Sequence, residues 1–109
     1  MSMGASIVSY AVEPENTDAI QGNIREYLVP AARQTRGYRG FLLIDQGGGK
    51  HLALLLFDSV EDAQAAQGAL TPVGREHTYA LMAGPAQGSL GTIVIGDGVF
   101  AQPIKSQQP

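Results

Sequence analysis

Residues 40–57 have the sequence GFLLIDQGGGKHLALLLF, in which two apolar runs flank three consecutive glycines. Runs of this kind favour β-strands, and a short glycine-rich connection between them favours a hairpin. We therefore predict strands over 40–45 and 51–57, joined by a flexible loop over 46–50. Successive side chains of a strand point to opposite faces, and here neither face is polar. One face carries Leu42, Ile44, Leu52, Leu54 and Leu56, and the other carries Phe41, Leu43, Ala53, Leu55 and Phe57.

The segment before the hairpin predicts one strand and one helix. Residues 5–12 mix β-branched and aromatic residues and stop just before Pro14, where a ladder donor is lost. Apolar residues then recur every three or four positions, which predicts a helix over roughly 16–35. Pro30 lies inside this helix, so a kink is expected near residues 26–27. The periodic positions are Ile20, Ile24, Leu28 and Ala31.

The segment after the hairpin predicts a second helix and a last strand. Ser59 is followed three positions later by an acidic residue, the pattern of a helix cap, and an alanine-rich run over 63–70 comes next. Thr71-Pro72 interrupts this helix, and 73–83 resumes it. Residues 91–101 are rich in β-branched residues and predict the closing strand.

The predicted elements follow the order β-α-β-β-α-β. This is the ferredoxin-like arrangement, an α+β fold in which both helices cover one face of an antiparallel sheet. Helices on one side leave the second apolar face of the hairpin uncovered. An exposed apolar face of that extent marks an interface, and a symmetric homodimer packed sheet on sheet is the simplest way to bury it.

Composition excludes several classes of function. Ten acidic and seven basic side chains give a formal charge of −3, which provides no positive surface for nucleic acid or anionic lipid. The chain has no cysteine, so disulfides, thiolate nucleophiles, iron–sulfur clusters and cysteine zinc sites are excluded. We predict no nucleic-acid partner and no membrane partner.

Length and hydropathy indicate one domain. A chain of 109 residues with 44% hydrophobic and 16% charged residues can bury one core. We predict a single domain over 1–109, with an ordered core over about 5–101 and a loose, proline-containing tail over 102–109. The chain shows neither an apolar run of roughly 20 residues nor a signal-peptide pattern, so a cytoplasmic location is expected.

Several motifs together resemble one known family. They are the start of the first hairpin strand, GYRGF at 37–41, the step into the second helix, FDSVEDA at 57–63, and the closing β segment. In this element order they resemble the antibiotic biosynthesis monooxygenase-like family of dimeric α+β barrel proteins, over roughly residues 5–101. The family holds cofactor-free monooxygenases of phenolic or quinol-type polyketides, haem-degrading enzymes and members without an assigned activity. These motifs are turns, caps and strand edges, so they specify a fold and carry no catalytic group.

The resemblance also bears on Gly96-Asp97-Gly98. The sequence alone fits either a tight hairpin turn or a bulge inside one longer strand. The final strand of the family often carries a glycine, so the resemblance favours the bulge.

The resemblance implies a cavity between the sheet and the helices of each protomer. A cofactor-free oxygenase binds an electron-rich aromatic molecule, favours its anion and lets oxygen react with it directly. It therefore needs a base or hydrogen-bond partner in an apolar pocket. We predict His77 and Tyr27 as catalytic residues, and Tyr10, Arg33 and Tyr79 as substrate-binding residues.

Each main candidate has a simpler alternative. His77 is one of two histidines and lies in a helix-like stretch, but its charged neighbours also fit a surface position. Tyr27 falls between apolar positions of the first helix, where core packing alone explains an aromatic ring. Arg33 stands near the end of that helix and suits its negative dipole terminus without any ligand.

No metal or cofactor is expected. His51 and His77 make no metal-binding spacing, and the position of His51 beside Lys50 and the glycine loop favours a solvent-facing edge residue. The chain has no tryptophan, and residues 5–12 have no asparagine, so two groups that assist haem-degrading relatives are absent. The glycine loop joins antiparallel strands and lacks the phosphate-loop spacing, so we interpret it as a turn.

Three functions stay open at this point. The first is a cofactor-independent monooxygenase with a small cavity for an aromatic or polyketide-like substrate. The second is a non-catalytic, ligand-binding or stress-related barrel that binds a small apolar molecule. The third is a structural subunit without a usable pocket. A polar group inside a cavity favours the first, and a purely apolar cavity favours the second.

Overall fold

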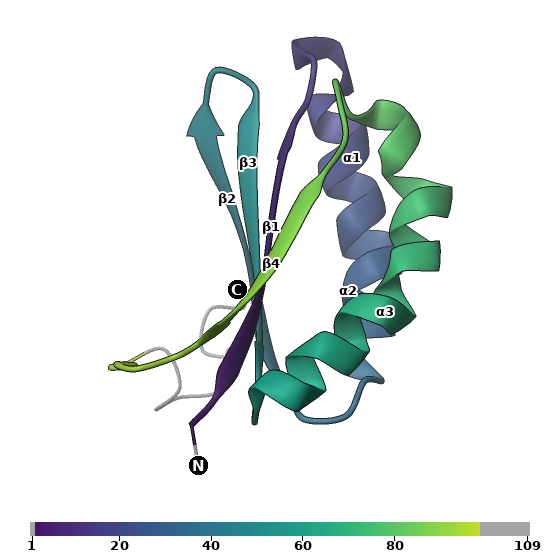
Figure 1. The fold of residues 1–109 in the computed structure, drawn as a ribbon. Helices are drawn as coiled ribbons and strands as arrows, with labels where there is room; N and C mark the ends of the chain where they lie inside the picture. Colours follow the sequence, from purple (N-terminus) through teal and green to yellow (C-terminus); the bar gives the residue numbers. More distant parts are fainter. Residues whose placement is uncertain (1, 99–109) are drawn as a thin grey trace.

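Four antiparallel strands form one sheet in the computed structural model, which describes residues 2–98 (Figure 1). The sheet has the order β2-β3-β1-β4, and all main helices cover the same face of it, which confirms the ferredoxin-like α+β fold. The strands are β1 (Gly4–Ala11), β2 (Tyr38–Gly47), β3 (Lys50–Phe57) and β4 (Gln87–Thr92). The main helices are α1 (Thr17–Asn23), α2 (Val29–Arg33) and α3 (Val60–His77).

Glycines close the hairpin between β2 and β3. Gly47, Gly48 and Gly49 have φ angles of 84°, 64° and 80°, in the left-handed region that other residues rarely adopt. A Cβ on Gly49 would also stand 2.6 Å from the carbonyl oxygen of Val12. The Val12 amide donates to the Gly49 carbonyl at 2.7 Å. The predicted turn is confirmed, and this bond ties it to the chain just after β1.

The first predicted helix is built in three pieces. A π-helical turn, η2 (Ile24–Leu28), separates α1 from α2 and is closed by a bond from the Val29 amide to the Ile24 carbonyl. Pro30 has no amide hydrogen, and in a regular helix its ring would crowd the Glu26 carbonyl. A wider turn just before the proline relieves that clash. The irregularity predicted near residues 26–27 is therefore confirmed.

The second predicted helix needs a correction. The sequence predicts an interruption at Thr71-Pro72, but α3 runs unbroken through it and is followed by a short 3₁₀ turn, η3 (Tyr79–Leu81). Leu70 and Gly74, on either side of the proline, are both buried. Packing on both sides of Pro72 holds the helix despite one lost backbone bond. Within residues 2–98, no helix is both long and apolar enough to cross a membrane.

The last strand lies earlier in the chain than predicted. β4 ends at Thr92, which faces Gly4 at the start of β1, and Gln87 faces Ser9 at its other end. Of the strand predicted over 91–101, residues 91–92 belong to β4 and residues 93–98 do not, because strand propensity alone does not show where the partner strand ends. One further backbone bond, from the Ile93 amide to the Met3 carbonyl at 2.8 Å, follows Thr92.

Residues 96–98 lie in no strand, so the bulge predicted there is wrong. Just before them, the side chains of Val94 and Ile95 are 86% and 85% exposed. The predictions for residues 99–101 and for the loose tail over 102–109 lie outside the described residues.

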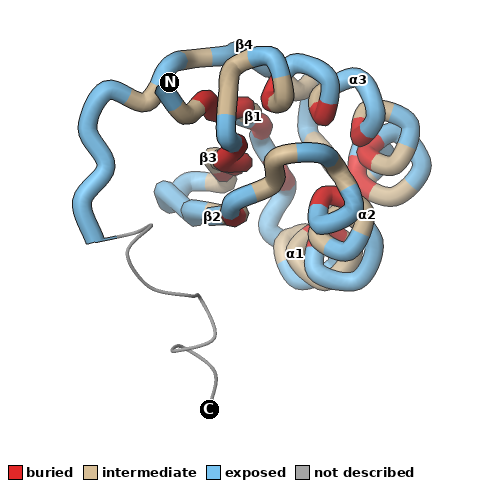
Figure 2. Tube along the Cα trace, turned by 90° about the horizontal axis from the view of Figure 1, so that it is seen from below, coloured by how far each residue is buried: buried red, intermediate tan, exposed pale blue. Residues whose placement is uncertain are grey.

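The core lies between the sheet and the helices, where Figure 2 shows the buried positions of β1, β3 and α3 facing one another. Ala53, Leu55 and Phe57 of β3 pack there against Ala63 and Ala66 of α3. The opposite face of the sheet has no helix over it (Figure 1). It carries Ile7, Leu42, Ile44, Leu52 and Leu54, which are partly or largely exposed. The two apolar faces predicted for the hairpin are therefore present.

Candidate functional site

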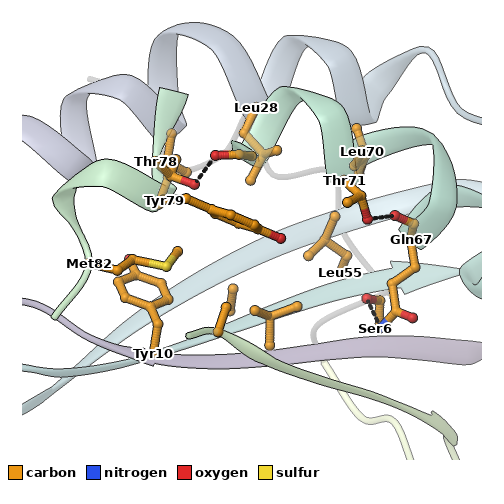
Figure 3. A pocket seen from close by; sticks show the side chains of 15 residues that line it. Ser6, Tyr10, Leu28, Leu55, Gln67, Leu70, Thr71, Thr78, Tyr79 and Met82 are labelled. Carbon is orange, nitrogen blue, oxygen red and sulfur yellow. Dashed lines mark hydrogen bonds between the residues drawn. The ribbon is translucent and has the colours of Figure 1, made fainter. Parts of the chain in front are cut away.

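A cavity of about 100 Å³ lies between the sheet and α3 (Figure 3). Most of its wall is apolar and comes from β1, β3, η2, α3 and the segment after η3. Pockets for small molecules are usually roughly 300–1,000 Å³ in volume, so in this state the cavity has room for at most one small ring. Its main apolar residues are Val8, Leu28, Ala53, Leu55, Leu70 and Met82.

One end of the cavity is polar. Gln67 of α3 donates its side-chain amide to the Ser6 hydroxyl and to the Ser89 carbonyl, both at 3.0 Å. Thr71 donates its hydroxyl to the backbone carbonyl of Gln67 at 2.7 Å. Both amide hydrogens of Gln67 are used within the protein, so this end of the cavity joins α3 to β1 and β4.

Tyr10 stands at the other end, below Met82 (Figure 3). The residue is 6% exposed, and within residues 2–98 its hydroxyl has no hydrogen-bond partner. Burial, and secondly the negative charge of Asp45, raise the pKa of the Tyr10 phenol from its usual value of 10.0 to about 12. Tyr10 is therefore a neutral, unused hydrogen-bond donor near neutral pH. Tyr10 lines the cavity, and substrate binding by it stays a prediction.

Tyr79 covers the cavity from the side of the helices. Figure 3 shows its ring lying across the cavity, with the hydroxyl pointing inward. The residue is 42% exposed and belongs to the short turn η3. A Cβ on Gly74 would come within 3.3 Å of the Tyr79 ring, so the glycine leaves space for that ring. Tyr79 therefore forms a partly exposed wall of the cavity.

His51 is buried, contrary to the prediction of a solvent-facing edge residue. It is 1% exposed, and its ring stacks on Tyr10 with a centroid separation of 5.2 Å. Its Nε2 lies 2.9 Å from the side-chain nitrogen of Gln21 in α1 and 4.0 Å from a carboxylate oxygen of Asp45. Its Nδ1 has no partner within residues 2–98. His51 therefore extends the polar environment of Tyr10 behind the cavity wall.

His77 and Tyr27, the predicted catalytic residues, come together but do not line the cavity. Their rings stack with centroids 3.8 Å apart, where the end of α3 meets η2. The His77 ring is 24% exposed and lies 3.7 Å from Glu76, and Tyr27 is 40% exposed. The expectation that Tyr27 packs in the core is wrong. The catalytic role of both residues stays a prediction.

Arg33, the remaining predicted substrate-binding residue, is exposed in the last turn of α2 and away from the cavity. Its positive charge acts on Tyr38, whose pKa is raised by burial and lowered in part by this arginine. The simpler alternative, a cation at a helix C-terminus, describes its position.

Sequence reasoning missed Ser6, Gln67 and Thr71 of the cavity lining and misplaced the nearby His51. Ser6 and Tyr10 alternate with outward residues of β1, and His51 occurs two positions before the buried Ala53. The period of two along each strand was the signal that places all three on the helix side. No local signal marks Gln67 or Thr71, because their place depends on how α3 crosses the sheet.

The lining limits the chemistry that the cavity can perform. The polar residues that line it are Ser6, Tyr10, Gln67, Thr71, Thr78 and Tyr79. Among the described residues that line it, none is charged near neutral pH. Nor do residues 2–98 contain a cluster of three or more histidine, aspartate or glutamate side chains suited to a metal ion. The cavity can bind an apolar molecule and direct a hydrogen bond to it, but it holds no strong base of its own.

Several solved structures share this fold. No protein-family model and no curated protein matches the sequence. A candidate antibiotic biosynthesis monooxygenase from Nitrosomonas europaea superposes with a TM-score of 0.73 at 19% identity, over 89% of this chain and 95% of that one. A protein of unknown function from the same organism gives 0.74 at 14% identity, over 89% and 94%.

A third structure is described by its activity. A variant of SnoaB, a cofactor-independent oxygenase from Streptomyces nogalater, superposes with a TM-score of 0.70 at 10% identity, over 88% of this chain and 97% of that one. Identities of this size establish shape and not chemistry. The chain therefore has the fold of the antibiotic biosynthesis monooxygenase-like proteins, as its motifs predict.

Proposed function

We propose that this chain is a small-molecule-binding α+β barrel protein that oxygenates an aromatic or polyketide-like molecule without a cofactor. The observation that carries the proposal is the apolar cavity between sheet and helices, which is lined by two phenol side chains, Tyr10 and Tyr79. Its likeness in fold to a cofactor-independent oxygenase supports the same reaction class. The reaction needs an apolar site that brings an electron-rich ring together with dissolved oxygen, and this cavity is of that kind.

The substrate supplies all the electrons in such a reaction. A ring CH₂ group between two aryl groups, as in an anthrone, becomes a carbonyl. One atom of O₂ enters the product, and the other leaves as water with the two hydrogens of the CH₂ group. The part of the protein is to hold the substrate, to exclude bulk water and to favour the anionic form of the substrate through hydrogen bonds.

The size of the cavity restricts the substrate. A volume of about 100 Å³ does not admit a molecule of three fused rings. Movement of the partly exposed Tyr79 would enlarge the site, since η3 is short and Tyr79 covers one side. Single-ring hydroquinones therefore belong in the substrate panel beside anthrones.

Oxygen uptake tests the proposed reaction. Purified protein without added flavin, haem or metal is incubated with hydroquinones and anthrones, in air and without oxygen, beside boiled protein. We expect oxygen-dependent product formation above the boiled control. Equal rates with native and boiled protein across the panel would contradict the oxygenase proposal.

A second function is favoured by a specific observation. The described cavity lining has no histidine, carboxylate, lysine or arginine, so the same cavity also suits a non-catalytic barrel that only binds an apolar ligand. That function predicts higher melting temperatures with panel compounds and no oxygen uptake.

The roles proposed for His77 and Tyr27 are tested separately. Both lie outside the cavity lining, so they can act only if the substrate reaches the stacked pair. Under the proposal, His77→Ala abolishes turnover and leaves the fold nearly intact. Unchanged turnover would remove His77 from the mechanism.

We also propose that the partner is a second copy of this chain, packed on the outer face of the sheet. Leu42 and Ile44 are 39% and 40% exposed on a face that no helix of the described chain covers. A two-fold axis at this face would pack this aliphatic patch against the same patch of the other copy. The exposed Val94 and Ile95 add apolar surface beyond β4.

A further inference from the structure

Two buried side-chain atoms lack a hydrogen-bond partner within residues 2–98, and they belong to one stacked pair. They are the hydroxyl of Tyr10 and Nδ1 of His51, on neighbouring strands β1 and β3. Nearly all buried polar groups in native proteins have a hydrogen-bond partner. Two neighbouring buried atoms without one therefore call for a specific explanation. A missing ligand group is one such explanation, since Tyr10 also lines the cavity.

The unpartnered phenol of Tyr10 points to one kind of ligand atom. A neutral phenol offers a hydrogen, and its oxygen is a weaker acceptor. On the neighbouring His51 ring, Nε2 lies 2.9 Å from the side-chain nitrogen of Gln21 and 4.0 Å from a carboxylate oxygen of Asp45. What the Tyr10 hydroxyl lacks is therefore an acceptor.

Tyr10 is the member of this pair that lines the cavity, and His51 does not line it. The stacked His51 ring, held by Gln21, fixes the tyrosine from behind and makes His51 a positioning residue. At the opposite end of the cavity Gln67 uses both amide hydrogens within the protein. The Tyr10 end of the cavity thus has a buried hydroxyl without a hydrogen-bond partner among residues 2–98.

We propose that Tyr10 anchors an oxygen atom of the ligand, so that the cavity selects an apolar ring bearing a carbonyl, phenol or phenolate oxygen over the same ring without it. This inference rests on the proposed ligand-binding cavity and adds the chemical group that the cavity recognises. A charged amine has only donors and could use only the weaker acceptor of the phenol, so it is expected to bind less well than an oxygen acceptor. The anchor also sets the orientation of the ring, with its oxygen toward β1.

Phenol and toluene test the anchor, since they share a shape and differ in one oxygen. Their binding to wild-type protein and to Tyr10→Phe is followed by NMR titration of the backbone amides. A hydrogen bond of ordinary strength predicts that Tyr10→Phe weakens phenol binding by about 3- to 10-fold. Toluene binding stays the same or tightens. The spectrum of the ligand-free variant shows whether it is folded.

Tyr38→Phe serves as the matched control, because Tyr38 packs on Phe57 and does not line the cavity. It is expected to leave the affinities for phenol and toluene unchanged. Equal changes for both ligands in Tyr10→Phe would overturn the anchor while leaving the cavity in place. No binding of either ligand to wild-type protein would overturn the proposed cavity function, and the anchor with it.

Discussion

At the scale of single residues, Tyr10 makes the stability of the folded protein depend on pH in the alkaline range. Its pKa is raised from 10.0 to about 12, so the folded state retains this proton more tightly than the unfolded state. The stabilisation is fully present below pH 10 and is lost as the pH rises toward 12. Between pH 9 and 11 we expect the wild type to lose about 1 kcal/mol of unfolding free energy relative to Tyr10→Phe.

Urea unfolding of both proteins at the two pH values measures this difference, and contributions from other groups such as Tyr38 cancel. At pH 7 the variant should be as stable as the wild type or slightly more stable, since it removes an unpaired buried hydroxyl. An equal fall in the unfolding free energies of both proteins with pH would show that folding does not change the pKa of Tyr10.

The two histidines should differ strongly in their effect on stability. His51 is 1% exposed, so His51→Ala leaves a buried cavity and a Gln21 amide without its partner. We expect the free energy of unfolding to fall by about 2–4 kcal/mol. His77→Ala removes a partly exposed ring at the end of α3, and we expect the free energy of unfolding to fall by less than about 1 kcal/mol. Chemical denaturation of both variants provides the comparison. Similar losses would contradict the assignment of His51 to the structural core.

His51 also shows where sequence reasoning failed at this scale. Its neighbours Gly49 and Lys50 indicate an exposed strand edge, and this local signal led to the wrong prediction. The alternation along β3 places it on the same face as Ala53 and Leu55, which are buried. The pairing of Tyr27 with His77 had no such signal, because their contact depends on how α3 ends beside η2.

At the scale of elements, the start of β1 packs directly on the start of α3. A Cβ on Gly4 would stand 2.5 Å from the backbone of Val60, and backbone atoms cannot move aside as a side chain does. Gly4→Ala is therefore expected to destabilise the protein by about 1–3 kcal/mol. Gly22→Ala is the matched change within α1, where an added Cβ meets nothing within 4 Å.

The alanine at position 22 should stabilise the protein by about 0.5–1 kcal/mol, because glycine is a poor helix former. Melting temperatures of both variants test these predictions, since Gly4→Ala should lower the melting temperature and Gly22→Ala should raise it. A tolerated Gly4→Ala would mean that β1 and α3 are not in close contact.

Elements with local causes were predictable from the sequence, and elements fixed by distant contacts were not. The hairpin turn needs glycines at 47–49, and Ser59 caps α3 by accepting from the Asp62 amide at 3.1 Å. Both causes lie within a few residues. The course of α3 through Pro72 depends on packing against the sheet, and the end of β4 depends on where β1 begins. Neither cause is visible in the segment itself.

At the scale of the whole molecule, the sheet is apolar on both sides and has helices on only one (Figure 2). The sequence predicts this directly, because the hairpin strands carry apolar residues at odd and even positions alike. What the sequence alone does not reveal is the small volume of the cavity on the helix side, which results from how the side chains interlock. The uncovered face is the larger feature, and it leads to the proposed homodimer.

A charge on the uncovered face should separate the two copies. Leu42→Lys would bury an unpaired ammonium group twice in a symmetric interface, at a cost that weakens association by at least about 10- to 100-fold. Ala65→Lys adds the same charge on the exposed side of α3 and should leave association unchanged.

Sedimentation at micromolar protein concentration distinguishes the monomer of 11.4 kDa from a dimer of twice that mass. We expect the wild type and Ala65→Lys at the larger mass and Leu42→Lys at the smaller one. A wild type that sediments as a monomer, or a Leu42→Lys variant that stays dimeric, would exclude this face as the interface.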